Sequence, residues 1–112
     1  GLTATVAKAS AGAVEYMKVA RVTNISAAIG ELKEKGVWVF GTAAEGSIPM
    51  YQADLSGPTA IVIGNEGAGL SQLVRKNCDV MVNIPMRGRI SSLNASAAAS
   101  ILLYEALRQR LG

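Results

Sequence analysis

Two loops of the sequence carry groups that could bind a ligand. The first, "GNEGAG" at residues 64–69, is rich in glycine, but its G-x-x-G-x-G spacing matches neither the dinucleotide fingerprint nor the P-loop. Its one charged residue, Glu66, would repel a phosphate and suits a neutral or cationic ligand, or a hydroxyl group that must be held. The alternative is a structural turn in which Glu66 stabilises the start of the next helix.

The second loop, "MRGRISSLN" at residues 86–94, combines two arginines with short polar side chains. Arg87 and Arg89 could clamp phosphates through their guanidinium groups. Ser92 adds a hydroxyl group, and Asn94 can cap the following helix, whose first backbone N–H groups are able to grip a ligand. The alternative is an exposed turn whose arginines are only solvated.

The residues that follow the second loop are unusually small. From Asn94 to Ser100 the sequence reads "NASAAAS", with nothing larger than Asn. A helix that only filled a core would use Leu or Ile there, so this composition favours close approach of a backbone or a ligand. It does not identify which of the two approaches.

Apolar runs alternate with helical patterns along the chain. We predict helices at Thr3–Met17, 26–36 (capped by Ser26 and ended by Gly36), 71–77 and Asn94–Arg110, a helical turn at Met50–Ala53, and strands at Val19–Asn24, 37–43, 59–64 and 79–85. This alternation predicts one α/β domain with a mostly parallel sheet flanked by helices.

Three of the predicted strands end in unusual loops. Gly41 and Thr42, read as a tight turn, lie at the end of the first, the glycine-rich loop follows the second, and Pro85 stops the third and opens the loop up to Leu93. In a parallel sheet the carboxyl ends of the strands form the ligand-binding edge. We therefore expect one shared site there.

Composition narrows the class of protein. The chain of 112 residues has a net charge of +3, which permits a phosphate-rich partner without requiring one. With no histidine, imidazole catalysis and His-containing zinc sites are excluded, and we expect no metal.

Cys78, the single cysteine, fits a reducing cytoplasm, and no apolar run reaches the roughly 18–20 residues of a membrane span. We expect a cytoplasmic protein without a membrane partner.

Taken together, "AIVIGNEGAGLS" and "VNIPMRGRISSLNASAAASILLYE" resemble the second and third motifs of the SpoU (TrmH-type) RNA 2′-O-ribose methyltransferases of the SPOUT superfamily. "GLTATVAKASAGAVEYMKVARVTN" is similar to the branch that methylates a guanosine ribose in bacterial 23S ribosomal RNA. The resemblance implies a carboxy-terminal deep trefoil knot, with the last helix threaded through a preceding loop. Such threading would explain the small residues at the start of that helix.

The resemblance also implies S-adenosylmethionine as cofactor, its adenine held mainly by backbone groups. The matching cofactor positions are Gly64, Ile84 and Leu93, with Gly41 and Thr42 as a further contact. Glu66, Ser92 and Asn94 match the polar positions expected to act in catalysis, around an activating arginine. Arg87 and Arg89 are the expected RNA contacts.

Family resemblance further implies a homodimer formed through the knotted region. The apolar residues expected to serve both core and partner are Ile101, Leu102, Leu103, Ala106 and Leu107.

One part of the family pattern is not found. The first motif, an Asn-x-Gly stretch ending in the activating arginine, does not occur in this chain. We therefore expect residues 1–112 to be an incomplete catalytic domain, without that motif or an amino-terminal RNA-binding domain, and to transfer methyl groups poorly or not at all. The alternatives are a non-catalytic knotted dimerisation or RNA-binding module and, less well supported for lack of a phosphate signature, an unrelated nucleotide-binding domain.

Overall fold

A computed structural model of the chain describes residues 4–9, 17–21, 24–64, 70–85 and 95–112. The strands among them are β1 (Ala4–Ala9), β2 (Met17–Arg21), β3 (Trp38–Thr42), β4 (Ile48–Pro49), β5 (Thr59–Gly64) and β6 (Val80–Asn83). The helices are α1 (Ile25–Glu34), α2 (Gln72–Asn77) and α3 (Ala95–Leu111), with a 3-10 turn, η1, at Met50–Gln52.

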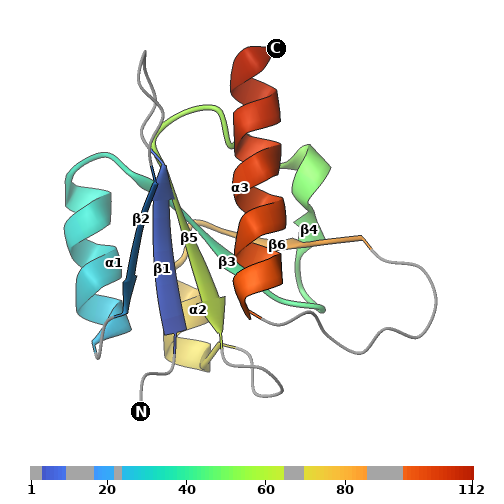
Figure 1. Cartoon of the computed structure of the whole chain (residues 1–112). Helices are drawn as coiled ribbons and strands as arrows, with labels where there is room; N and C mark the ends of the chain where they lie inside the picture. Colours follow the sequence, from blue (N-terminus) through green and yellow to red (C-terminus); the bar gives the residue numbers. More distant parts are fainter. Residues whose placement is uncertain (1–3, 10–16, 22–23, 65–69, 86–94) are drawn as a thin grey trace.

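The described strands form one sheet in the order β2-β1-β5-β3-β6-β4 (Figure 1). β5, β3, β6 and β4 run parallel, whereas β1 is antiparallel to both β2 and β5. Helix α3 covers one face of the sheet, and α1 and α2 lie on the other (Figure 1). The predicted α/β class with a mostly parallel sheet and flanking helices is confirmed.

Alternating residues of the central strands fill two cores, one on each face. Phe40, Ile61 and Ile63 pack with the inner face of α3, whereas Val39 and Val62 pack with α1. All five are buried, which explains why β3 and β5 read as continuous apolar runs rather than alternating ones. Burying each such side chain contributes about 1.5–3 kcal/mol, so the position of the central strands is firmly set.

The helix boundaries follow capping residues. α1 is capped by Asn24, whose side-chain oxygen accepts a 3.1 Å hydrogen bond from the Ala27 N–H, two residues before the predicted cap at Ser26. The helix terminates before Gly36, where the backbone has a φ of +80°, a conformation that favours glycine. α2 is capped by Ser71, whose hydroxyl oxygen accepts a hydrogen bond from the Val74 N–H at 3.2 Å.

The helix predicted over Thr3–Met17 is wrong for the described residues of that range. Ala4–Ala9 forms β1, and β2 begins at Met17, two residues before the predicted strand. The reason is long-range pairing: β1 pairs along the whole of β5, from Ala4 with Gly64 to Ala9 with Thr59. These ladder hydrogen bonds satisfy the backbone and override the helix preference of alanine.

The predicted strands at 37–43, 59–64 and 79–85 and the predicted turn η1 are confirmed, and β4 was not predicted. The threading that would make a knot depends on residues 86–94, which lie outside the described residues, so the knot stays an expectation. Among the described helices, none has the length and apolar character needed to cross a membrane.

Candidate cofactor site

The carboxyl ends of β5, β3 and β6 lie side by side at one edge of the sheet. In the parallel register, Gly41 of β3 pairs with Val62 of β5, and Thr42 pairs with Val82 of β6. Gly64 and Ile84 each follow those partners by two residues. The structure therefore brings together four of the predicted cofactor positions: Gly41, Thr42, Gly64 and Ile84.

The other predicted site residues fall on segments outside the described residues. These are Glu66 in the glycine-rich loop and Arg87, Arg89, Ser92, Leu93 and Asn94 before α3. In the sequence, the first of these segments follows β5 and the second follows β6, the strands whose carboxyl ends share that edge. Their roles remain predictions.

Gly41 lies within β3 rather than in the tight turn that the sequence predicted. Pairing with Val62 on one side and Met81 on the other keeps its backbone extended. A Cβ atom at this position would lie 2.8 Å from the Sγ atom of Cys78, 2.8 Å from the Sδ atom of Met81 and 3.0 Å from Leu70 Cδ1. Close packing over the strand therefore requires glycine here.

Cys78 is a packing residue in this arrangement. Burial, with a smaller contribution from the neighbouring Asp79 carboxylate, raises the pKa of its thiol to about 11. A thiol with so high a pKa is neutral at physiological pH and behaves as a small apolar side chain. Its side chain packs against the edge of the sheet beside Gly41.

Two further hydrogen bonds join the strands at the end of β3. The Thr42 hydroxyl group donates to the Val62 carbonyl at 3.4 Å, and the Ala43 N–H donates to the Val82 carbonyl at 3.1 Å. Thr42 thus bridges towards β5 while Ala43 bridges towards β6. The two contacts hold the three strand ends together.

A short loop, residues 43–47, leaves β3 at this edge and is tied down by side chains that the sequence did not single out. The Ser47 hydroxyl group donates to the Ala43 carbonyl at 2.7 Å and accepts from the Asn83 side-chain amide at 3.0 Å. From α2, the Arg75 guanidinium donates to the Glu45 carbonyl at 2.9 Å. Arg75 and Glu45 are 30 residues apart and Asn83 and Ser47 are 36 residues apart, so no local sequence pattern predicts these two contacts.

The described part of this edge offers mainly backbone groups and few charged side chains. Among the residues that the structure describes, no three His, Cys, Asp or Glu side chains lie close enough together to hold a metal ion. The carboxyl ends of parallel strands are where such sheets bind ligands, and main-chain groups there suit a ligand recognised through its hydrogen-bonding edge.

The fold and this edge define an α/β domain that binds ligands at the carboxyl ends of its parallel strands. Comparison with known proteins gives the family of the chain. Residues 1–104 match the model of the SpoU rRNA Methylase family. The chain therefore belongs to this family, whose members are RNA methyltransferases.

Curated relatives are similar over nearly the whole chain. It is 53% identical over 110 residues to the 23S rRNA (guanosine-2'-O-)-methyltransferase RlmB of Shewanella oneidensis, covering 98% of this chain and 45% of that protein. It is 50% identical over 110 residues to the putative TrmH family tRNA/rRNA methyltransferase YacO of Bacillus subtilis, covering 98% of this chain and 44% of that protein. The chain thus spans less than half the length of these relatives.

Solved structures share the fold. The A. aeolicus TrmH/SpoU tRNA modifying enzyme matches with a TM-score of 0.72 and 38% identity, over 80% of this chain and 46% of that one. The SpoU methyltransferase AviRb from Streptomyces viridochromogenes, in complex with the cofactor AdoMet, matches with a TM-score of 0.67 and 42% identity, over 78% of this chain and 35% of that one.

Proposed function

We propose that this chain is part of an S-adenosylmethionine-dependent enzyme that methylates a ribose 2′-hydroxyl of RNA, with a guanosine of 23S ribosomal RNA as its target. The observation that carries the proposal is the meeting of Gly41, Thr42, Gly64 and Ile84 at one edge of the sheet. The target is supported by 53% identity to a relative named for that reaction. Ribosomal RNA as the proposed substrate supports a cytoplasmic location for the enzyme.

Recognition of the cofactor is assigned to the backbone. Gly64, Ile84 and Leu93 are proposed to bind the adenine edge through their main-chain groups, with Gly41 and Thr42 as a further contact. The half-buried Ile84 side chain can flank the ring. S-adenosylmethionine would supply a methyl group on a sulfonium, which is transferred to the ribose oxygen.

The chain's own polar residues are proposed to orient the ribose. Methyl transfer requires the 2′-hydroxyl to lie in line with the methyl group and to lose its proton. Glu66, Ser92 and Asn94 are the residues assigned to this positioning. Because the motif with the activating arginine is not found here, we propose that residues 1–112 hold an incomplete catalytic domain that transfers methyl groups poorly or not at all by itself.

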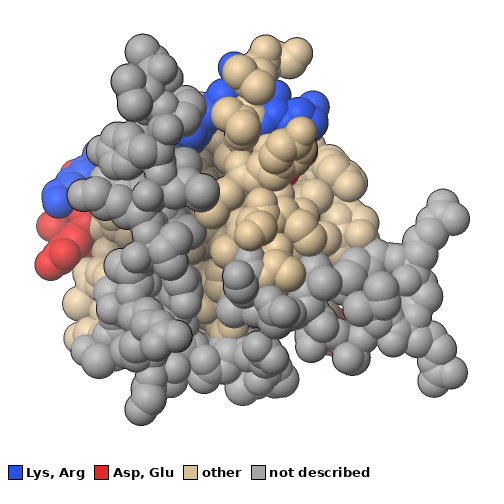
Figure 2. All heavy atoms as spheres, viewed as in Figure 1, with Lys and Arg blue, Asp and Glu red and all other residues tan. Residues whose placement is uncertain are grey.

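RNA binding is assigned to Arg87 and Arg89. In Figure 2, Lys and Arg side chains also gather around the carboxy-terminal end of α3, which carries Arg108 and Arg110. Arg108 binds Glu105 there, and Arg110 donates to the backbone carbonyls of Ser56 and Gly57. That end of α3 also lies away from the carboxyl end of β5 (Figure 1), so its arginines are assigned to the fold.

A homodimer through the knotted region is part of the proposal. Of the apolar α3 residues expected to serve core and partner together, Leu102 and Ala106 are fully buried in the core. Ile101, Leu103 and Leu107 are only half-buried. Tyr104 leaves 72% of its surface exposed, which adds an apolar, hydrogen-bonding side chain to the surface available to a partner.

Calorimetric titration of the chain with S-adenosylmethionine, paired with a methyl-transfer assay on 23S ribosomal RNA, tests the proposal. We expect cofactor binding with little or no transfer. Absence of binding would contradict the proposed site and favour a non-catalytic knotted module. Rapid transfer by the chain alone would contradict the assignment of the essential arginine to a motif not found here.

A further inference from the structure

We infer that Asn83 and Ser47 are positioning residues of the cofactor site, which lock the loop after β3 against the end of β6. The inference rests on the proposed function, because it assigns these side chains to the support of that site. Asn83 is the last residue of β6 and immediately precedes Ile84, while Ser47 ends the loop that begins just after Thr42.

The two side chains form a continuous hydrogen-bond chain between the strand ends. The Asn83 amide donates to the Ser47 hydroxyl oxygen at 3.0 Å, and that hydroxyl group donates to the Ala43 carbonyl at 2.7 Å. Ala43 is itself joined to β6, because its N–H donates to the backbone carbonyl of Val82 at 3.1 Å. Ala43, the residue after Thr42, is thus linked to β6 twice: once through its backbone to Val82, and once through the side chains of Ser47 and Asn83.

The same loop is also held by a residue of α2. The Arg75 guanidinium donates to the Glu45 carbonyl at 2.9 Å, and Gly46, with a φ of +65°, lets the chain turn beneath it. A Cβ atom at Gly46 would lie 2.9 Å from the Arg75 Nη2 atom, so the contact is close. The loop is thus anchored at two points, at Glu45 by Arg75 and at Ser47 by Asn83.

Such a lock matters because the proposed site binds through its backbone. A site built from main-chain groups is only as ordered as the segments that carry those groups. Asn83 and Ser47 are half-buried at an edge of the sheet, outside both apolar cores. Removing either is therefore expected to loosen the edge while leaving the cores intact.

The chain contains a matched control. The Asn77 amide donates to the Ser26 hydroxyl oxygen at 3.4 Å, which is the same pair of side-chain types joining α1 and α2 instead of two strand ends. Affinity for S-adenosylmethionine should fall about fivefold to tenfold in Asn83→Ala and Ser47→Ala, as expected for one lost hydrogen bond. Asn77→Ala and Ser26→Ala should stay within about twofold of the unsubstituted chain.

Two further variants separate positioning from general stability. Ser47→Thr keeps the hydroxyl group and should keep the affinity, whereas the double variant Asn83→Ala/Ser47→Ala should lose little more than either single one. In urea unfolding, the variants at Asn83 and Ser47 should have the same midpoint as the control variants at Asn77 and Ser26. Equal affinity of the edge and control variants would overturn the inference while leaving the proposed function intact.

Amide hydrogen exchange of residues 43–47 tests the lock without any ligand. Asn83→Ala should speed exchange in this loop, and Asn77→Ala should not. If the unsubstituted chain bound no cofactor, the proposed function would fail, yet this measurement would still decide whether the lock exists. Unchanged exchange in Asn83→Ala would overturn it.

Discussion

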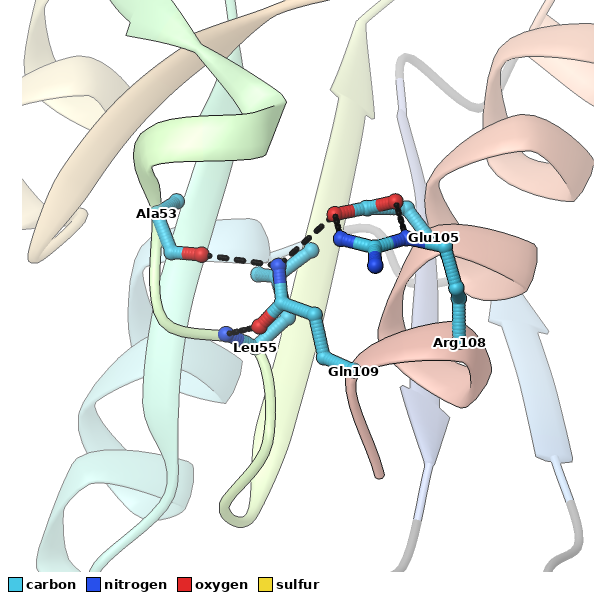
Figure 3. Close-up of polar contacts among 5 residues, drawn as sticks. All are labelled: Ala53, Leu55, Glu105, Arg108 and Gln109. Atoms are coloured by element: carbon cyan, nitrogen blue, oxygen red, sulfur yellow. Dashed lines mark hydrogen bonds and ion pairs between the residues drawn. The ribbon is translucent and has the colours of Figure 1, made fainter. Parts of the chain in front are cut away.

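The side-chain oxygen of Gln109 accepts a hydrogen bond of 2.7 Å from the backbone N–H of Leu55, 54 residues earlier in the chain (Figure 3). Its amide nitrogen donates to the Ala53 carbonyl at 3.0 Å and to Glu105 at 2.9 Å. Gln109 thus supplies the backbone partners of a segment that lies between η1 and β5. The last turns of α3 are thereby fixed to the connection that leads into the central strand.

Gln109→Ala should destabilise the fold. Leu55 is fully buried, so its N–H would lose its partner without gaining water, at a cost of about 1–3 kcal/mol. Urea unfolding measures this cost. Gln52→Ala is the control, because Gln52 is exposed in η1, and an equal loss in both variants would contradict the account.

Glu105 should make stability depend on pH. Hydrogen bonds from Arg108, at 2.8 Å to each carboxylate oxygen, hold the pKa of this nearly buried carboxyl group below its usual 4.5. A carboxyl group with a lowered pKa stabilises the folded state above its unfolded pKa, and that stability is lost as the pH falls through the folded pKa.

Glu105→Gln should therefore cost about 1–2 kcal/mol at pH 7 and progressively less below pH 4. Urea unfolding of both proteins across this range gives the difference. A difference that stays constant with pH would show that the charge of Glu105 contributes nothing.

Two glycine substitutions should act in opposite directions. At Gly41 a Cβ atom would meet the sulfur atoms of Cys78 and Met81 at 2.8 Å, so Gly41→Ala should cost about 1–3 kcal/mol through overpacking. At Gly30, inside α1, a Cβ atom meets nothing within 4 Å, so Gly30→Ala should stabilise by about 0.5–1 kcal/mol. Unfolding free energies that change with the same sign would contradict this packing.

Cys78 should react slowly with thiol reagents in the folded protein. Its pKa of about 11 leaves little thiolate at pH 8, so labelling should be at least about tenfold slower than for a free cysteine. Labelling in urea is the control and should proceed at the free rate. A fast reaction in the folded state would show that Cys78 does not pack over Gly41.

The sequence predicted those parts of the fold that depend on local pattern. The apolar runs of β3 and β5 and the short helix predicted at 71–77 each carry their own signal, and the order of the strands brings three strand ends to one edge. β1 gave no such signal, because alanine favours a helix and only pairing with β5 makes it a strand. The polar links were missed for a related reason, since Asn83 and Ser47 meet only after folding.

The ends of β5, β3 and β6 are expected to form one adenosyl pocket, and NMR tests this most directly. S-adenosylmethionine should be titrated into the ¹⁵N-labelled chain while the backbone amide signals are followed. We predict that the largest shifts fall at Thr42, Gly64, Ile84 and Leu93. Shifts confined to other parts of the chain, or no shifts at saturating cofactor, would contradict the pocket.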